Sequence, residues 1–431
     1  MLPNLTFQKF QMVQRNLEAL LKSRLWAKLL FALFLGVVFG YVLVNLEREI
    51  GGTWSLIVAD WIALPGSIYL AAIQMVIVPL VLCSIILALS SINQETKARK
   101  VGTTSLIFVL VSTAFAAFVG IGVTDFFNPG ETIRKTLNIQ SSITPYQQEH
   151  FRITPDTVLR FIPTNPLESI LKADLLEILI ISFIFGIVMS QMESLQVRPL
   201  QQFLKGVQAL CLQVITLAMR LAPFAVFGLM LRAVVHSGMT VLTGMIGYLL
   251  CTFLGFFIMI ICYLAWVSLI AKISPLEFLR RTREALLLAF SLSSSAATMP
   301  TTLKVAREEL NVEDEISQLV IPLGTTINMA GSAIWQTSAT IFLAQVFGAE
   351  VSWSQFLLIA MLTVGSSIGT PGVPGAGLGV LSSTLKSVGV PSTGIPLILG
   401  VDRLVDMGCT VVNVMGDLVM CLTSKWALRD K

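Results

Sequence analysis

Long apolar stretches separated by short polar segments run along most of the chain. A helix needs about 20 apolar residues to cross the hydrocarbon core of a bilayer. Six stretches reach or approach this length, at Leu29–Leu46, Ser67–Leu89, Val101–Val123, Leu175–Met192, Val207–Val235 and Val241–Ile270. The pattern therefore predicts an all-α polytopic membrane protein.

Two later apolar stretches are interrupted near their midpoints. Phe278–Val305 is broken by Ser291–Pro300, and Phe356–Val388 is broken by Gly365–Gly377. Each predicts a re-entrant helical hairpin, because non-helical backbone at membrane depth must be buried in protein or line a wet cavity. Paired broken segments are also the best sequence indication of a transporter binding site.

A third interruption lies between the two predicted hairpins. The apolar stretch Leu319–Phe347 contains Asn328–Ser332, a segment rich in carbonyl, amide and hydroxyl oxygens. Such oxygens are the ligands that hard cations prefer. The segment predicts an unwound helix that can bind sodium.

The final apolar helix, predicted at Pro396–Leu422, carries an unusual polar stripe. Its polar residues are spaced by 4, 4, 3 and 4 positions, which places them on one helical face, and they are Asp402, Asp406, Thr410, Asn413 and Asp417. A carboxylate at the bilayer centre costs about 2.5 to 3.5 kcal/mol, so the stripe must face protein, water or ions. It predicts a binding site for cations or an amine, although Asp402 alone is equally well explained by pairing with an arginine.

Composition supports a membrane protein and excludes several other classes. Hydrophobic residues make up 55% of the chain and charged residues 13%, against about a quarter charged in soluble domains. The net charge of +4 comes from basic residues at the ends of apolar segments, so it does not indicate nucleic-acid binding. Six cysteines without paired spacing and two histidines indicate neither a disulfide framework nor a metal centre.

Charge distribution predicts the orientation and the division of the chain. Basic residues cluster on alternate loops and at both ends, which places both termini in the cytoplasm of a cell-membrane protein. Residues 1–24 form a predicted cytoplasmic segment, and residues 25–270 hold six helices with a long external loop at 125–165. Residues 271–431 hold both hairpins, the unwound helix and the final helix, and form the predicted transport core.

Four motifs of this core resemble the signature blocks of the dicarboxylate/amino acid:cation symporters, the glutamate-transporter family. They are SSSAATMP (293–300), GTTINMAGS (324–332), SIGTPGVPGAG (367–377) and DRLVDMGCTVVNVMGD (402–417). MVIVPLV at 75–81 is similar to the second helix of the family. The resemblance implies eight transmembrane helices, two re-entrant hairpins, a homotrimer and an elevator mechanism.

The resemblance also implies a substrate site. Its residues would be Ser294, Ser295, Ser332, Val373, Gly375, Gly377, Asp406, Cys409, Thr410 and Asn413, with Asp406 holding the substrate ammonium. Members with acidic substrates have an arginine at the position of Cys409, whereas neutral amino acid exchangers have cysteine or threonine. We therefore predict symport of a small neutral amino acid. The alternative is an acidic amino acid or C4-dicarboxylate bound by Arg403, which lies about 100° from the polar stripe and can instead pair with an acid.

The resemblance also implies cation sites, and this chain keeps the ligands of some of them but not of others. Two sodium sites look intact, and their residues would be Gly324, Thr326, Asn328, Met329, Ser367, Ile368, Thr370, Asn413 and Asp417. A third site would lack ligands, since Ala330 and Val109 replace an aspartate and a tyrosine of the family. Gln336 replaces a glutamate of potassium- and proton-coupled relatives, which argues against counter-transport of those ions.

Two other function classes remain open at this point. An intramembrane hydrolase could use Ser294 as nucleophile, but neither His150 nor His236 lies in an apolar segment that could supply a base. An ion channel could also use the polar stripe. Both are weaker than a carrier, so we predict no enzymatic activity and no cofactor other than sodium as coupling ion.

Overall fold

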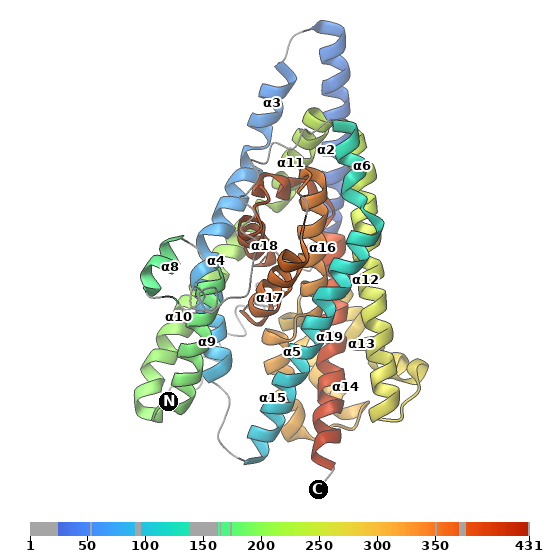
Figure 1. The fold of residues 1–431 in the computed structure, drawn as a ribbon. Coiled ribbons are helices and arrows are strands. Elements are labelled where there is room, and N and C mark those ends of the chain that lie inside the picture. The colour runs from blue at the N-terminus through green and yellow to red at the C-terminus, as the bar shows by residue number, and fades with distance from the viewer. Residues whose placement is uncertain are drawn as a thin grey trace.

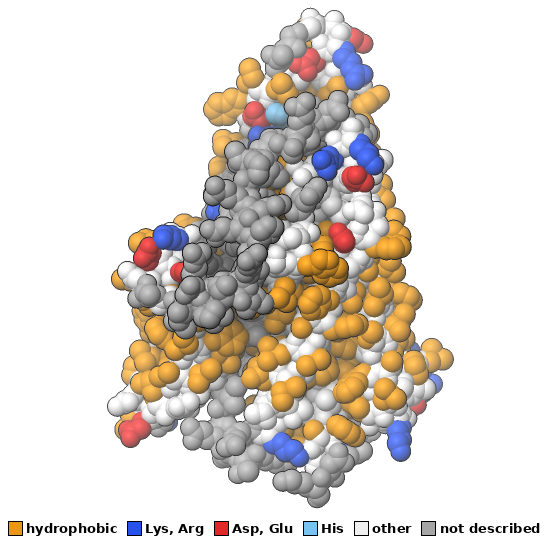
Figure 2. Space-filling model, in the orientation of Figure 1, with side chains coloured by type: hydrophobic (Ala, Val, Ile, Leu, Met, Phe, Trp, Pro, Cys, Tyr) orange, Lys and Arg blue, Asp and Glu red, His pale blue; other side chains and the backbone are white. Residues whose placement is uncertain are grey.

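The computed structural model describes residues 25–51, 54–90, 96–137, 163, 165–172, 175–349, 351–369 and 376–429. Every regular element within these ranges is helical, and together the helices form an elongated bundle (Figure 1). Figure 2 shows a broad hydrophobic band over the lower half of this face, with charged side chains above it and at its lower edge. This distribution is that of a protein embedded in a bilayer.

The first part of the chain forms ten described helices. They are α2 (Leu25–Ile50), α3 (Trp54–Ile62), α4 (Leu64–Ser90), α5 (Thr96–Phe127), α6 (Pro129–Leu137), α8 (Pro166–Lys172), α9 (Leu175–Gln191), α10 (Ser194–Ala218), α11 (Ala222–Ser237) and α12 (Thr240–Ile270). Every predicted apolar segment falls on one of these helices, except that the fifth is divided. α10 and α11 meet at an angle of 59°.

The second part contains the hairpins and the final helix. Its helices are α13 (Pro275–Leu292), α14 (Ser295–Glu308), α15 (Asp314–Ile327), α16 (Ala330–Phe347), α17 (Trp353–Gly369), α18 (Ala376–Ser387), a 3-10 turn at Ser392–Gly394, and α19 (Ile395–Arg429). In Figure 1, α13 and α14 lie toward the end of the bundle that holds the carboxy terminus. α17 and α18 lie farther from that end, packed against α4 and α16.

Fewer than the predicted eight helices are long and apolar enough to span a membrane in the described part of the chain. Among the described residues, five helices are long and apolar enough to span a bilayer, or six if α10 and α11 form one bent span. α9 is apolar but has only 17 residues. The count of eight therefore stays a prediction, whereas an all-helical fold with several apolar helices is confirmed for the described residues.

The first part of the predicted external loop at 125–165 is helical. α5 continues to Phe127, and α6 follows at once from Pro129, a residue that is favoured in the first turn of a helix. α6 packs against α12 and α16, so tertiary contacts compensate for its polar sequence. Residues 138–162, like the predicted cytoplasmic segment 1–24, lie outside the described part of the chain.

The interruptions are narrower than predicted. The first hairpin turns at Ser293, which has a left-handed φ of 50°, and Ser294, whose side chain caps α14 by accepting from the Ala297 N–H at 3.3 Å. Pro300 lies inside α14, so the predicted break at Ser291–Pro300 shrinks to two residues. The unwound helix is likewise broken only at Asn328 and Met329.

α19 is the central helix of the structure. It packs against α12, α16, α15, α13, α5 and α11. In its apolar window 83% of the residues are buried inside the protein, against 17% for α2. The polar stripe of α19 therefore faces protein and not lipid, as its energetic cost requires.

Candidate functional site

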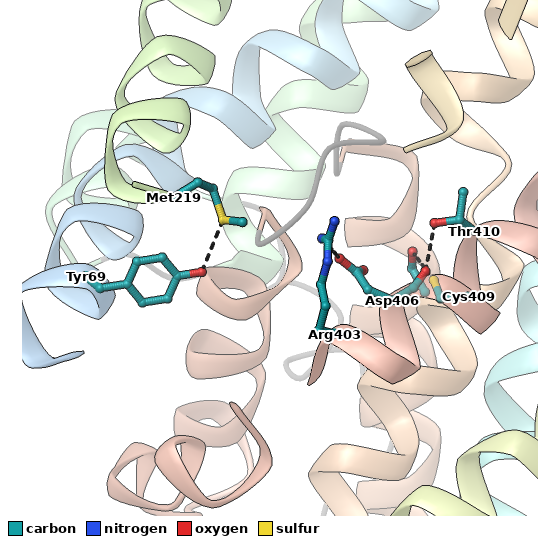
Figure 3. A network of polar contacts seen from close by, with 7 residues as sticks. Tyr69, Met219, Arg403, Asp406, Cys409 and Thr410 are labelled. Carbon is teal, nitrogen blue, oxygen red and sulfur yellow. Dashed lines mark hydrogen bonds and ion pairs between the residues drawn. The ribbon is translucent and has the colours of Figure 1, made fainter. Parts of the chain in front are cut away.

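The two charged residues at the start of the α19 stripe form an ion pair. Arg403 Nη1 lies 3.4 Å from Asp406 Oδ2, and the side chains are 8% and 27% exposed. Figure 3 shows the two groups pointing at each other from adjacent turns of α19. The Thr410 hydroxyl donates to the Asp406 carbonyl oxygen at 2.8 Å, so it is turned toward its own helix.

A small cavity lies beside this pair. Its volume is about 30 Å³, enough for a water molecule. Its wall is mostly apolar and comes from four other helical segments as well as α19; the lining residues are Leu29, Tyr69, Met219, Ala222, Val226, Leu399, Gly400, Asp402, Arg403 and Asp406. The Tyr69 hydroxyl donates to Met219 Sδ at 3.5 Å across the cavity from Arg403 (Figure 3). The sequence carried no signal for Tyr69 or Met219, which are ordinary residues of apolar helices.

A second polar cluster lies deeper along α19, where it meets the break before α16. Cys409 Sγ lies 3.3 Å from Ser332 Oγ, and Asn413 Nδ2 lies 3.4 Å from the same hydroxyl. Asn413 Oδ1 accepts from the Gly331 N–H at 2.8 Å. A Cβ on Gly331 would lie 2.3 Å from the Cys409 carbonyl oxygen, so glycine permits this close approach. The structure thus brings together the predicted substrate residues Ser332, Cys409 and Asn413.

The hairpin residues of the predicted site are only partly described. Ser294 and Ser295 are buried, and the Ser295 hydroxyl has no hydrogen-bond partner among the described residues. Both arms of the first hairpin pack against α19. Gly377 lies in the first turn of α18, the second arm of the other hairpin, close to Trp335, and Val373 and Gly375 lie outside the described residues.

The deepest part of the stripe has the chemistry of a cation site. Asp417 is fully buried, and its Oδ1 accepts from Asn328 Nδ2 at 2.9 Å. Asp417 Oδ2 and Asn328 Oδ1 are also buried and have no hydrogen-bond partner among the described residues. Unpartnered buried oxygens of this kind are costly unless something binds them. They are hard ligands, so the residues present fit a sodium ion.

Position 324, beside the Asp417 carboxylate, requires a glycine. A Cβ on Gly324 would lie 2.3 Å from Asp417 Oδ1. The Gly324 carbonyl oxygen accepts from the Asn328 N–H at 2.8 Å, which closes the last turn of α15. The predicted ligands Gly324, Asn328, Asn413 and Asp417 therefore lie in one place.

The second predicted cation site is less complete. Thr326 Oγ1 donates to the Pro322 carbonyl oxygen at 3.2 Å, and Met329 is buried. The Ser367 hydroxyl near the end of α17 is buried without a partner among the described residues. Thr370 and the side chain of Ile368 lie outside the described structure, so this site stays a prediction.

A tyrosine that sequence reasoning missed lies beside the first cation site. Tyr263 of α12 is buried, and a Cβ on Gly416 would lie 2.6 Å from both its hydroxyl and Asn328 Nδ2. Its ring stacks on Phe108 at a centroid distance of 6.2 Å. A single tyrosine in an apolar helix gives no hint of this position in the sequence. Val109 and Ala330 are buried and supply no side-chain oxygen to the region.

Comparison with known proteins agrees with these features. Residues 25–426 match the Sodium:dicarboxylate symporter family. The proton/sodium-glutamate symport protein of Bacillus subtilis (strain 168) is 33% identical over 369 residues, covering 84% of this chain and 85% of that protein. The proton/glutamate-aspartate symporter of Escherichia coli (strain K12) is 28% identical over 415 residues, covering 94% and 93%. The C4-dicarboxylate transport protein of Bacillus subtilis (strain 168) is 27% identical over 398 residues, covering 92% and 91%.

Proposed function

We propose that this chain, which belongs to the sodium:dicarboxylate symporter family, carries an acidic amino acid across the membrane together with a coupling cation. Membership of this family makes the chain a secondary symporter and not an enzyme. The alternative of an intramembrane hydrolase acting through Ser294 is therefore wrong, and symport replaces the hypothesis of an ion channel.

The names of the relatives favour an acidic substrate over the small neutral amino acid predicted from Cys409. They refer to glutamate, to glutamate and aspartate, and to C4-dicarboxylates. All of these solutes carry two carboxylate groups. The neutral substrate is thus not supported by the comparisons, and the alternative of an acidic substrate becomes the proposal.

The observation that carries this proposal is the buried Arg403. Its guanidinium lines the cavity and makes one ion pair, with Asp406, while its Nε is buried without a hydrogen-bond partner among the described residues. A guanidinium presents several donors in a planar fork that matches a carboxylate. Arg403 can therefore receive the side-chain carboxylate of a substrate, the role that Cys409 cannot fill.

Asp406 favours an amino acid over a dicarboxylate that lacks nitrogen. Its carboxylate lies beside the same cavity and is 27% exposed, so a substrate ammonium can reach it. An amino acid needs more space than 30 Å³, so the cavity forms only one edge of the proposed site. Its other edge is the cluster of Ser332, Cys409 and Asn413, whose polar atoms suit the α-carboxylate.

Sodium is the proposed coupling ion at Asp417. The support is the pair of unpartnered buried oxygens on Asp417 and Asn328. We also propose that the protein is a homotrimer with both termini in the cytoplasm. Residues 271–431 would move like an elevator against the preceding helices. These three points rest on the motifs and on the distribution of basic residues.

Substrate uptake into liposomes containing the purified full-length protein tests the proposal. Labelled glutamate, aspartate, succinate, alanine and serine would be compared, with sodium and pH gradients applied separately. We expect accumulation of glutamate or aspartate. Arg403→Ala should abolish this uptake, while Arg403→Lys should retain part of it because the charge remains.

A neutral amino acid is the second candidate, favoured by the surroundings of Cys409. Its thiol contacts the Ser332 hydroxyl and the Asn413 amide, and no cationic side chain makes a described contact with it. Uptake of alanine or serine that survives Arg403→Ala, with no uptake of glutamate, would replace the acidic substrate by this candidate.

A further inference from the structure

The cavity beside α19 contains two carboxyl groups and one guanidinium. Asp402 and Asp406 lie one helical turn apart and both line it, with Arg403 between them in sequence. Arg403 forms its ion pair with Asp406. Within the described residues, no hydrogen bond or ion pair reaches the Asp402 carboxyl group, so its charge lacks a direct partner.

Among the described residues, the surroundings of Asp402 offer no second cation. The titratable or charged groups that interact with it electrostatically are Tyr69 of α4, Tyr248 of α12, and Arg403, Asp406 and Cys409 of α19. The Tyr69 hydroxyl already donates to Met219. The other elements around the cavity contribute apolar side chains, which are Leu29, Ala222 and Val226. An ionised Asp402 would therefore leave one negative charge uncompensated.

The Asp402 side chain is half-buried in this largely apolar wall, where an uncompensated charge is unfavourable and such groups tend to become neutral. A metal cation would need several oxygen ligands around it. The cavity has room for a water molecule, and its wall is largely apolar, so it cannot supply such a coordination shell. A proton needs no shell and neutralises the carboxylate directly.

We propose that Asp402 is the proton-binding residue of the transport cycle. A carboxylate oxygen of Asp402 takes a proton from water when the cavity communicates with one side of the membrane, and it returns the proton to water on the other side. Gln336 cannot fill this role, because its amide does not titrate in the physiological range. The inference rests on the proposed symport function and assigns one coupling ion to a residue of this chain.

The test measures proton entry and amino acid accumulation together. Full-length protein is placed in liposomes that contain a pH-sensitive dye, with the membrane voltage clamped and no sodium gradient. With the interior one pH unit more alkaline, the wild type should accumulate labelled glutamate about tenfold, the ratio that one coupled proton sustains. Asp402→Asn should accumulate none above equilibrium and should admit no protons.

Two further variants separate titration from structure. Asp402→Asn should still exchange internal for external glutamate at equal pH, since exchange needs no net proton movement. Asp402→Glu, which keeps a titratable group, should restore gradient-driven uptake in part. Asp60→Asn is the matched control, because Asp60 is a half-exposed carboxylate of α3 paired with Arg232, and it should behave as the wild type.

Several outcomes would overturn the inference. Proton-driven accumulation by Asp402→Asn would place the proton elsewhere. A wild type that accumulates glutamate under the pH gradient without admitting protons, or that exchanges glutamate but does not accumulate it under that gradient, would exclude proton coupling. Loss of exchange in a monodisperse Asp402→Asn protein would make Asp402 part of the substrate site. If the wild type exchanges serine but not glutamate, the proposed substrate is wrong, and the same measurements with serine still decide the role of Asp402.

Discussion

We expect substrate binding to depend most directly on Asp406. Its carboxylate forms an ion pair with Arg403 and lines the cavity. Asp406→Asn should abolish amino acid binding, because loss of one partner of a buried charge pair costs about 3 to 5 kcal/mol, or about two to three and a half decades in affinity. Calorimetry on the purified variant measures this affinity directly. A wild-type affinity would remove Asp406 from the site.

Gly324 should be essential for the cation site. A Cβ there would lie 2.3 Å from Asp417 Oδ1, so Gly324→Ala must displace the carboxylate. Overpacking of this kind costs about 1 to 3 kcal/mol, which corresponds to a loss of sodium affinity of about 5- to 150-fold. The shift of thermal unfolding with sodium concentration measures this affinity.

Gly206→Ala is the matched control for this substitution. Gly206 lies in α10, and nothing lies within 4 Å of a Cβ placed on it. The control should keep the sodium dependence of the wild type. If Gly324→Ala does the same, the cation does not bind beside Asp417.

At the scale of helices, the close packing of α5 on α16 also depends on glycine. A Cβ on Gly120 would lie 2.2 Å from Thr337 Oγ1 and 2.7 Å from the Ile334 carbonyl oxygen. Small residues allow membrane helices to approach each other in this way. Gly120→Ala should lower the free energy of unfolding by about 1 to 3 kcal/mol, measured by tryptophan fluorescence in detergent.

The same helix provides an internal control. Gly122 is two residues away, and a Cβ on it would meet nothing within 4 Å. Gly122→Ala should be neutral or stabilising, because alanine has the higher helix propensity by about 1 kcal/mol. Equal destabilisation by both substitutions would mean that helix packing at Gly120 is not the cause.

For the whole molecule, the proposed number of coupled sodium ions follows from what α5, α15, α16 and α19 contribute together. Asp417 and Asn328 supply unpartnered oxygens to one site, whereas Val109 and Ala330 supply none to the third site of the family. We expect at most two sodium ions per substrate. The slope of reversal potential against the logarithm of the sodium gradient, at fixed pH gradient, reports this number.

Asp417→Asn should remove one of these ions and weaken substrate binding as well, since the two affinities are linked reciprocally. A sodium stoichiometry of three would show that other oxygens, such as the buried Tyr263 hydroxyl, complete the third site. Substrate binding that is indifferent to sodium in the wild type would exclude sodium as the coupling ion.

The sequence by itself determined the membrane setting, the apolar helices, the interrupted segments and the polar stripe of α19. These features depend on local composition and on the helical period of 3.6 residues, which are written in neighbouring positions. The stripe predicted that Asp406 and Asp417 share one face, and the motifs identified the family. Local patterns were less reliable for α6, whose polar sequence folds as a helix because α12 and α16 pack against it.

Only the tertiary structure decided which groups meet across helices. It paired Arg403 with Asp406, left Asp402 without a direct partner among the described residues, and placed Tyr69 and Tyr263 beside the two ends of the stripe. It also narrowed the first hairpin break to Ser293 and Ser294. Such contacts depend on the packing of segments far apart in the chain, where side-chain volumes and buried polar atoms must be satisfied together, and no local pattern encodes that constraint.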